Sequence, residues 1–367
     1  MDRDSIFTTL SQLENNVRLH EGIYGIIKFL AVIDRYPNSS MINLSKEAGF
    51  PIPICVAIRN ELAKIGWCSR ESGGTEITEL GTEVLSKLGK FNESFSCIDC
   101  NGSGLKLSLE NYKDSLIQIR KFTDMRGPPN TVIDQSFATT ETSLVRVLTM
   151  GDNYDLFHGS YALIGDSDLT CIPLALFSNS KSRVVVFDID TRIRDIIDCA
   201  NKKLKLNIEF VEHDLRKNIP EEYKNQFGCF VTDPPYTING LNLFISRGIQ
   251  LINDTQGGVG YLSFGSKPPQ DQLQIQKNLS KMGCLFTHIL PRFNEYVGAQ
   301  KLGGVSTFYR LQILSDAEPL ICTDYEGILY TGERNPTIRA YQCKNCKIMI
   351  EVGQGNNFVT IEQLKEV

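Results

Sequence analysis

The chain has 367 residues and a net charge of −5, from 38 lysines and arginines against 43 aspartates and glutamates. Hydrophobic residues make up 41% of the chain and charged residues 22%, which excludes a disordered chain, a collagen or a coiled coil as a description of the whole. The length predicts two or three domains, and the acidic balance argues against a protein that coats nucleic acid through a basic surface.

The N-terminal residues lack the charged and apolar regions of a signal peptide, and no stretch reaches the roughly 18 apolar residues that a membrane span needs. We therefore expect a cytoplasmic protein that does not bind membranes. Disulfides are disfavoured in the cytosol, so the 11 cysteines are expected to be thiols or metal ligands.

Residues 1–92 are expected to form a winged helix-turn-helix domain, because three apolar patterns of helical spacing precede a polar hairpin. The expected elements are helices over Ile23–Ile33, Met41–Ala48 and Ile54–Trp67, a hairpin over Cys68–Thr78 and a closing helix over Thr78–Leu88. The alternative is a docking or dimerisation module. Residues 1–90 hold 10 basic and 11 acidic residues, whereas DNA affinity rests largely on neutralising phosphates, so we do not expect nucleic acid as a partner.

Residues 93–142 are expected to be a linker, and residues 143–324 a Rossmann-like catalytic domain of the methyltransferase type. Short apolar runs alternate there with helical stretches, which predicts an α/β fold with a doubly wound, mostly parallel sheet. The expected strands are Tyr161–Ile164, Arg183–Phe187, Ile208–Glu212, Cys229–Thr232, Gly258–Phe264 and Leu285–Leu290. Ligands bind such sheets at the carboxyl ends of the strands, so the residues after each strand matter most.

The turn after the first strand, Gly165-Asp166-Ser167-Asp168, contains one glycine and two carboxylates. Glycine in this turn lets the backbone approach a nucleotide. Two acids beside a ligand pocket suit a cationic substrate, so Asp166 and Asp168 are candidate catalytic residues. The alternative is that they cap the following helix, since Asp before a helix commonly bonds to its first amides.

Single acids follow the next two strands. Asp188 ends the apolar run of the second strand and is a candidate ligand for ribose hydroxyls, while Asp190 is expected to cap the next helix. Asp214 follows the third strand and can accept a hydrogen bond from an adenine amino group. An Asp that bonds to its own loop backbone explains Asp214 equally well.

The most specific motif follows the fourth strand and reads Asp233-Pro234-Pro235-Tyr236. The prolines fix the backbone and leave the Pro234 carbonyl available as an acceptor. This carbonyl and the Asp233 carboxylate can together hold an attacking amine. The ring of Tyr236 can stack on a base or cover a cation.

These strand-end residues carry a family resemblance. The Asp-Pro-Pro-Tyr motif looks like that of amino-methyltransferases acting on adenine or cytosine in nucleic acids. More of the chain resembles the branched-chain polyamine synthases, or N4-bis(aminopropyl)spermidine synthases, which also have an N-terminal winged-helix domain. The matching segments are Gly165–Thr170, Asp188–Asp190, Asp214–Lys217, Thr232–Pro235 and Arg292–Tyr296, with Asp134-Gln135 and Thr140-Glu141-Thr142 at the entry to the catalytic domain. In that family the turn reads Gly-Asp-Asp-Asp, and Ser167 stands here in place of the middle acid.

The resemblance implies an aminopropyltransferase that uses decarboxylated S-adenosylmethionine as co-substrate and spermidine as acceptor, and works as a homodimer. The implied catalytic residues are Asp166, Asp168 and Asp233. The implied co-substrate ligands are Gly165, Asp188 and Asp214, and the implied substrate ligands are Pro234, Tyr236, Glu295 and Tyr296.

Four cysteines form two Cys-x-x-Cys pairs, Cys97 with Cys100 and Cys343 with Cys346, the second in the polar C-terminal tail of residues 325–367. Together they supply the four ligands of a tetrahedral structural zinc, which would clip the tail onto the linker. The alternatives are two independent reduced pairs or a redox pair. The other seven cysteines are expected to be mostly core thiols.

Two other functions remain open on the sequence. One is a methyltransferase that uses S-adenosylmethionine and the Asp-Pro-Pro-Tyr motif to modify an amino group in nucleic acid, against which the acidic balance counts. The other is a non-catalytic, zinc-clipped winged-helix sensor of a nucleotide or polyamine, which Ser167 favours. Loss of turnover on replacing Asp233 would separate an enzyme from such a sensor.

Overall fold

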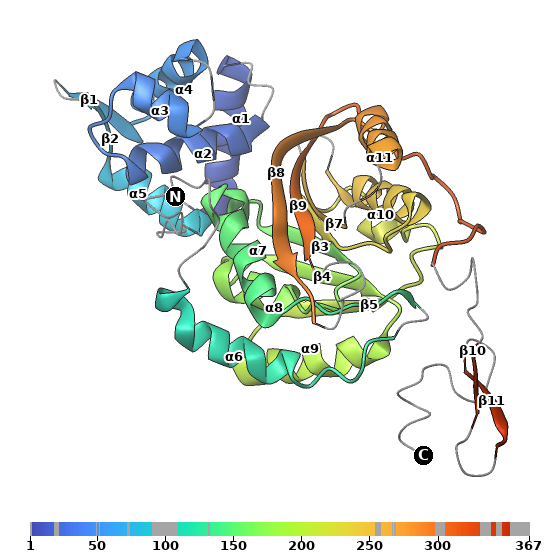
Figure 1. Cartoon of the computed structure of the whole chain (residues 1–367). Helices are drawn as coiled ribbons and strands as arrows, with labels where there is room; N and C mark the ends of the chain where they lie inside the picture. The colour runs from blue at the N-terminus through green and yellow to red at the C-terminus, as the bar shows by residue number, and fades with distance from the viewer. Residues whose placement is uncertain are drawn as a thin grey trace.

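The computed structural model describes residues 2–17, 22–48, 50, 52–71, 74–89, 109–130, 133–253, 258–265, 267, 269–297, 305–330, 339–342 and 347–352. A helical N-terminal region leads into a larger region built on a seven-stranded sheet (Figure 1). No helix within these ranges has both the length and the apolar character needed to cross a lipid bilayer.

The described residues of the N-terminal region form five helices and one hairpin. In chain order these are α1 (Arg3–Val17), α2 (Gly22–Arg35), α3 (Met41–Ala48), α4 (Ile52–Lys64), β1 (Cys68–Glu71), β2 (Gly74–Ile77) and α5 (Glu79–Leu88). The apolar helix α2 lies at the centre with ten of its residues buried, and the Thr78 side chain caps α5 by accepting a bond from the Gly81 amide. The sequence predicts this order except for α1, whose buried stripe is only Ile6, Leu10 and Leu13 in an otherwise polar helix.

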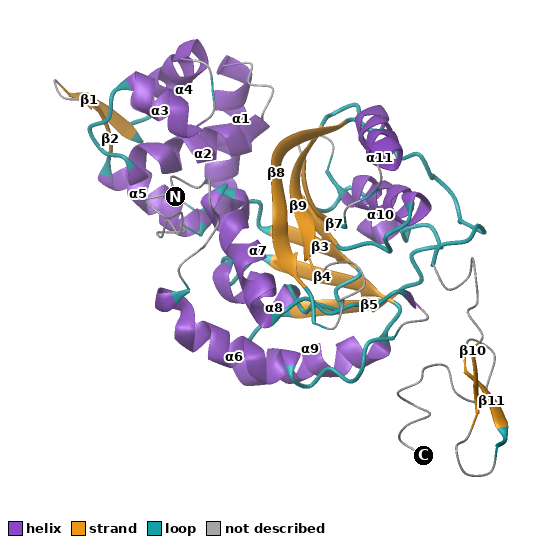
Figure 2. Ribbon diagram, viewed as in Figure 1, coloured by secondary structure: helices purple, strands orange, loops and turns teal. Residues whose placement is uncertain are grey.

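The larger region begins with helices and then alternates strands with helices (Figure 2). Its helices are α6 (Lys113–Thr123), α7 (Thr140–Asp152), α8 (Cys171–Phe177), α9 (Thr191–Leu204), α10 (Ile238–Leu251) and α11 (Pro269–Lys281), with short 3-10 turns at Glu110–Tyr112, Asp155–Phe157 and Glu221–Tyr223. Its strands are β3 (Ser160–Ile164), β4 (Arg183–Asp188), β5 (Ile208–Glu212), β6 (Cys229–Thr232), β7 (Gly258–Phe264), β8 (Cys284–Glu295) and β9 (Val305–Ile313).

The strands form one sheet in the order β5-β4-β3-β6-β7-β9-β8. Strands β3 to β7 are parallel, and β9 runs antiparallel between β7 and β8. Strands β4 and β5 lie on one side of β3. On its other side β6, β7, β9 and β8 follow in that order. The expected mostly parallel sheet is therefore confirmed, and its topological switch point, where such sheets bind ligands, lies between β3 and β6.

Both faces of the sheet are covered, as parallel sheets require. Tyr161 and Leu163 of β3 belong to the core beneath α6 to α9, whereas Ala162 and Ile164 belong to the core beneath α10 and α11. Figure 1 shows these two helical layers on opposite sides of the strands. Side chains along β3 point alternately to the two faces of the sheet, as in any strand. This alternation fixes which strand-end residues face which helices.

Strand β8 extends beyond the expected Leu285–Leu290 and reaches Glu295. The sequence does not predict this, because Pro291 and several polar residues interrupt the apolar run. Proline is tolerated at a sheet edge, where its missing amide leaves no ladder bond unpaired. The register of β8 against β9 also shifts between Leu290 and Asn294. The extension carries Asn294 and Tyr296 to the switch point.

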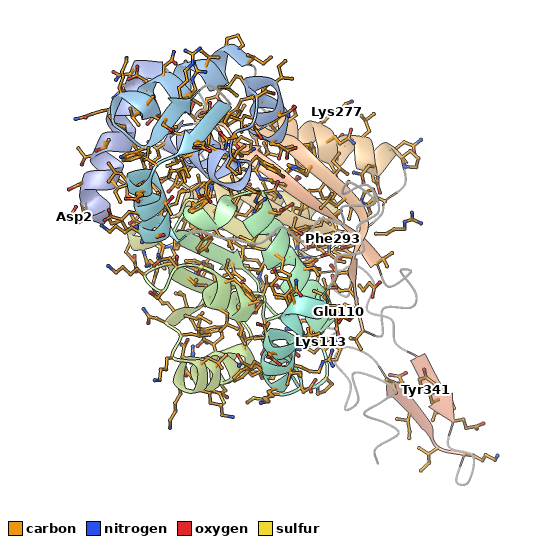
Figure 3. All side chains as sticks on the ribbon, turned by 90° about the vertical axis from the view of Figure 1, so that its left-hand side faces the viewer. Asp2, Glu110, Lys113, Lys277, Phe293 and Tyr341 are labelled. Carbon is orange, nitrogen blue, oxygen red and sulfur yellow. The ribbon has the colours of Figure 1, made fainter. Side chains whose placement is uncertain are left out.

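The segment after β9 wraps back over the sheet. Arg247 of α10 is fully buried and donates to the carbonyls of Leu215, Ile321 and Thr323, which ties this segment to the loop after β5. Beyond it, β10 (Arg339–Gln342) and β11 (Met349–Val352) form a separate hairpin. Figure 3 shows Tyr341 of this hairpin well apart from Phe293 of β8.

Candidate active site

The candidate site lies at the carboxyl ends of β3 and β6. These strands are direct neighbours, and Ile164 pairs with Thr232, whose hydroxyl donates to the Ile164 carbonyl at 2.8 Å. The turns that follow them contain Asp166 and Asp168 on one side and Asp233 on the other. The sequence motifs of the two turns therefore meet in space as expected for adjacent parallel strands.

An arginine that the sequence analysis does not single out joins these turns. Arg146 of α7 is 2% exposed, and its Nη1 donates to Asp168 Oδ2 at 2.7 Å while its Nη2 donates to Asp233 Oδ2 at 2.8 Å. Its Nε donates to the side chain of Asn294 at 2.8 Å. We call Arg146, Asp168, Asp233, Asn294 and Tyr296 the Arg146 cluster. One guanidinium thus spans three separate elements with its planar fork of donors.

Both carboxylate oxygens of Asp168 are engaged. Oδ2 accepts from Arg146, and Oδ1 accepts from the backbone amide of Ala138 at 2.7 Å. The Asp168 side chain is only 5% exposed. In this geometry Asp168 connects Arg146 to the segment before α7.

Asp233 presents a different environment. Its Oδ2 accepts from Arg146 and, at 2.5 Å, from the Tyr296 hydroxyl, whereas its Oδ1 has no hydrogen-bond partner in the part of the chain that is described. Its side chain is 17% exposed. Burial raises the pKa of the Asp233 carboxyl to about 7, even though Arg146 lowers it. A carboxyl group with a pKa near 7 and one open oxygen can accept a proton from a bound amine.

Two tyrosines wall the space beside Asp233. The Tyr236 hydroxyl donates to the Tyr296 hydroxyl at 2.9 Å, and the two rings meet edge to face with centroids 6.4 Å apart. Burial raises the pKa of Tyr296 well above its usual value, so its hydroxyl remains a donor to Asp233. Gly265 leaves room for the Tyr236 ring, because a Cβ there would lie 2.7 Å from the ring.

The prolines of the motif are buried and fix its backbone. The Pro235 carbonyl accepts from the Thr237 amide at 2.7 Å, and the Thr237 side chain caps α10. The ammonium of Lys267 donates to the Tyr236 carbonyl. Within the described chain no hydrogen bond to the Pro234 carbonyl is found.

Asp166 matches the capping alternative. Its two carboxylate oxygens accept from the amides of Thr170 and Cys171, at 2.8 and 2.9 Å, where α8 begins. Burial raises the pKa of its carboxyl to about 7. Between the two acids, Ser167 is half-buried, and its carbonyl accepts from Arg126 at 3.3 Å.

The residues predicted to bind the nucleotide line the neighbouring strand ends. Gly165 has a φ of 68°, a conformation that favours glycine, and the following Asp166 amide donates to Asp188 Oδ2 at 2.9 Å. Asp188 also accepts from the Asp190 amide, and Asp190 caps α9 as expected. Asp214 is half-buried and paired with Arg216 of its own loop, at 2.9 Å. Although burial acts in the opposite direction, hydrogen bonds from Arg216 lower the pKa of Asp214.

Glu295, an expected substrate ligand, lies outside the Arg146 cluster. Its side chain is exposed, while Asn294 is fully buried against Arg146 and donates to Ser306 at 2.9 Å. Neighbouring residues of a strand point to opposite faces, so only one of the two can face the site. The backbone of Glu295 pairs instead with Thr139 and Thr142 at the start of α7.

All four predicted zinc ligands, Cys97, Cys100, Cys343 and Cys346, lie outside the described residues. Within those residues, no group of three or more His, Cys, Asp or Glu side chains could hold a metal ion. The seven described cysteines are free thiols, and five of them are buried, as expected for core positions. They are Cys55, Cys68, Cys171, Cys199, Cys229, Cys284 and Cys322.

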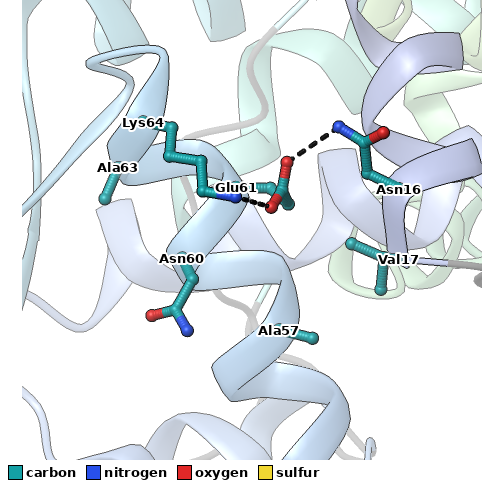
Figure 4. A pocket seen from close by; sticks show the side chains of 7 residues that line it. All are labelled: Asn16, Val17, Ala57, Asn60, Glu61, Ala63 and Lys64. Atoms are coloured by element: carbon teal, nitrogen blue, oxygen red, sulfur yellow. Dashed lines mark hydrogen bonds and ion pairs between the residues drawn. The ribbon is translucent and has the colours of Figure 1, made fainter.

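A pocket of about 700 Å³ lies in the N-terminal region, between the end of α1 and the exposed side of α4 (Figure 4). Glu61 accepts there from Asn16 at 2.9 Å and pairs with Lys64. None of the residues predicted for catalysis or ligand binding lines it. The other lining residues are Val17, Ala57, Asn60 and Ala63.

Comparison with known proteins places the chain in a family. A family model described as the branched-chain polyamine synthase A C-terminal domain matches residues 114–348. An uncharacterized protein of Methanocaldococcus jannaschii is 35% identical over 353 residues, which are 95% of this chain and 88% of that protein. The N(4)-bis(aminopropyl)spermidine synthases of the same organism and of Thermococcus kodakarensis are 35% and 32% identical, over 70% of this chain and 73% of each relative.

A solved structure shares the fold. The crystal structure of the branched-chain polyamine synthase from Thermus thermophilus, in complex with N4-aminopropylspermidine and 5′-methylthioadenosine, superposes with a TM-score of 0.54 at 23% identity. The match covers 91% of this chain and 99% of that one. Since the family model covers well over half of its residues, the chain belongs to the branched-chain polyamine synthase family, as its strand-end motifs predict.

Proposed function

We propose that this protein is an aminopropyltransferase, which moves an aminopropyl group from decarboxylated S-adenosylmethionine to an amine of a polyamine such as spermidine and so makes a branched polyamine. The observation that carries the proposal is Asp233, which follows β6 at the switch point of the sheet and whose Oδ1 has no hydrogen-bond partner in the described chain. Relatives with 32% to 35% identity carry the name of this activity.

The reaction joins an amine to the carbon next to a sulfonium. The nitrogen lone pair attacks the methylene carbon of the aminopropyl group, the carbon–sulfur bond breaks, and its electron pair stays on sulfur as methylthioadenosine leaves. The new ammonium then loses a proton to Asp233 Oδ1. The sulfonium is already a good leaving group, so most of the rate comes from holding amine and carbon in line.

Asp233 is better suited to this proton than the other two predicted acids. Each oxygen of Asp168 and of Asp166 already accepts a hydrogen bond, whereas Asp233 Oδ1 has no partner in the described chain. The Asp233 side chain is also more exposed, at 17% against 5% for Asp168. We therefore assign Asp168 and Asp166 to holding the site together and Asp233 to catalysis. Ser167, where the family turn has an acid, leaves Asp233 as the proton acceptor.

The co-substrate is expected to lie over the ends of β3 and β4. The turn at Gly165 brings the backbone close to the nucleoside, and Asp188 ends β4 where ribose hydroxyls lie in such folds. Both Asp188 oxygens accept one backbone bond each, which leaves lone pairs for a ribose. Asp214 is assigned to the adenine amino group.

The acceptor is expected to lie between Pro234, Tyr236 and Tyr296. Aromatic faces attract ammonium groups, which suits a polyamine with several charges along an apolar chain. The net charge of −5 adds a weak long-range attraction for a polycation.

The N-terminal region is proposed to be a winged-helix module that serves docking or homodimerisation rather than DNA binding. The winged-helix assignment is supported by the order of α2, α3, α4, the β1–β2 hairpin and α5. The basic residues of α4 are paired on their own helix, Arg59 with Asn60 and Lys64 with Glu61. This pairing supports docking or homodimerisation rather than DNA binding. Light scattering of the purified protein tests the dimer.

We also propose a cytoplasmic location and one structural zinc on the two Cys-x-x-Cys pairs.

Incubation of the protein with decarboxylated S-adenosylmethionine and a panel of polyamines tests the activity. We expect methylthioadenosine to form in proportion to a polyamine that has gained an aminopropyl group. Parallel incubation with S-adenosylmethionine and nucleic acid tests the methyltransferase alternative. Methyl transfer to nucleic acid, without methylthioadenosine from any polyamine, would overturn the proposal.

A further inference from the structure

We propose that Arg146 is the positioning residue of this active site, which favours the ionised form of Asp233 and turns one of its carboxylate oxygens to the acceptor amine. The inference rests on the proposed function, because it assigns a role within that reaction. Arg146 is 2% exposed and so does not itself contact substrate. Its effect must pass through the groups that it binds.

The geometry shows how one side chain fixes the carboxylate. Asp233 Oδ2 receives two bonds, from Arg146 Nη2 at 2.8 Å and from Tyr296 at 2.5 Å. Two bonds on a single oxygen leave the carboxylate little freedom to rotate, so Oδ1 stays directed away from both donors. Arg146 Nη2 also lies 3.2 Å from the Tyr296 hydroxyl, which locks the three groups into a triangle.

Arg146 is itself held from two further directions. Asp168 accepts from Nη1 at 2.7 Å and Asn294 accepts from Nε at 2.8 Å. The donors therefore connect the turn after β3, the turn after β6 and the end of β8 to α7. A lysine has the same charge but lacks the planar fork, so it cannot reproduce these contacts together.

The charge of Arg146 matters as much as its shape. Asp168 and Asp233 are two carboxylates on one guanidinium, and without it like charges would face each other in a poorly hydrated space. One of them would then take up a proton, as paired carboxylates do. Burial already raises the pKa of Asp233, so we expect the added proton there, and Asp233 would then lose its capacity to accept a proton from the amine.

The test compares Arg146→Gln and Arg146→Lys with a matched control, Arg310→Gln. Arg310 is also a largely buried arginine, and it binds Asp155 through Nε at 2.7 Å and Nη2 at 2.8 Å. Asp155 precedes β3, whereas the Arg146 cluster lies where the strands end. The control therefore leaves the buried Asp155 carboxylate without its arginine, away from the candidate active site. It reports what the loss of a buried arginine–carboxylate pair does in general.

Steady-state methylthioadenosine release is measured against pH for each variant. For Arg146→Gln we expect kcat to fall by about 10²-fold and the acidic limb of kcat/KM to move up by about 1–3 pH units. Arg146→Lys should restore the position of the limb but not kcat. Arg310→Gln should lower the melting temperature and leave the limb in place.

A second variant covers the case in which Arg146→Gln does not fold. Asn294→Ala removes one hydrogen bond from the guanidinium and keeps its charge, so kcat should fall by about 2- to 10-fold with an unchanged limb. An unchanged kcat and limb in Arg146→Gln would overturn the inference, as would wild-type kcat in Asn294→Ala.

A measurement without substrate separates this inference from the proposed function. The Asp233 carboxyl can be titrated by ¹³C NMR on aspartate-labelled protein, with Asp233→Asn to assign its signal. We expect a higher titration midpoint in Arg146→Gln than in wild type. If the midpoint rises but wild type transfers no aminopropyl group, the function fails and the role of Arg146 stands. If wild type is active and the midpoint does not move, the role of Arg146 fails.

Discussion

Replacing Asp233 with asparagine tests the proton acceptor with a minimal change of shape. The asparagine carbonyl can still accept the bonds that Arg146 and Tyr296 donate to Oδ2 at 2.8 and 2.5 Å. Its amide cannot take up a proton at neutral pH, so mainly the proton transfer is lost. General-base catalysis contributes about 10²- to 10⁴-fold, or roughly 3–5 kcal/mol of activation free energy. We expect kcat for methylthioadenosine release to fall by this factor.

The same variant should remain folded. It removes one of the two carboxylates around buried Arg146, which we expect to cost about 1–3 kcal/mol of unfolding free energy in a urea titration. Asp190→Asn is the matched control, because Asp190 is also a strand-end acid but caps α9 and binds Arg192. Asparagine caps helices about as well as aspartate, so this variant should keep most of its stability and wild-type kcat. A folded Asp233→Asn with more than about a tenth of wild-type kcat would refute the reasoning.

Three further predictions follow from the same contacts. Because the pKa of Asp233 is raised to about 7 and its ionised form accepts the proton, kcat/KM should fall as pH drops below about 7; a profile flat down to pH 5 would contradict this. Asp166→Ala removes the acceptor of the Thr170 and Cys171 amides, so urea unfolding should show a loss of about 1–2 kcal/mol. Metal analysis should find one zinc per chain, lost in a Cys97→Ser variant; purified protein without zinc would exclude the site.

Much of the sheet can be predicted from local sequence. The strands Ile208–Glu212 and Gly258–Phe264 agree with the structure at both ends, because apolar runs there are bounded by polar residues or glycine. Strand β9 and helices α6, α7 and α11 are not predicted. The burial that defines β9 comes from its place between β7 and β8, which is a long-range property of the sheet.

The candidate site could be predicted only in part. Asp168 and Asp233 can be located because they follow strands directly, and parallel strands bring their ends together. Arg146 and Asn294 could not, since they are 148 residues apart in sequence and meet only through folding. A signal for Arg146 does exist, as a single charge among the buried Leu144, Val147 and Leu148 of α7. A charge in such a stripe requires buried partners.

The side chain of Glu295 could not be placed from the sequence. A motif match places it beside Tyr296, but the alternation of β8 turns it to solvent and turns Asn294 inward. The motif therefore locates the segment, and the strand pairing shows which of its side chains face the Arg146 cluster.

The most direct test of the account is the structure of the product formed from spermidine and decarboxylated S-adenosylmethionine. NMR and mass spectrometry of the purified polyamine would show where the new carbon–nitrogen bond lies. The account predicts an aminopropyl group on the secondary nitrogen of spermidine, together with an equal amount of methylthioadenosine. Recovery of unchanged spermidine, with no methylthioadenosine above a control without enzyme, would contradict it.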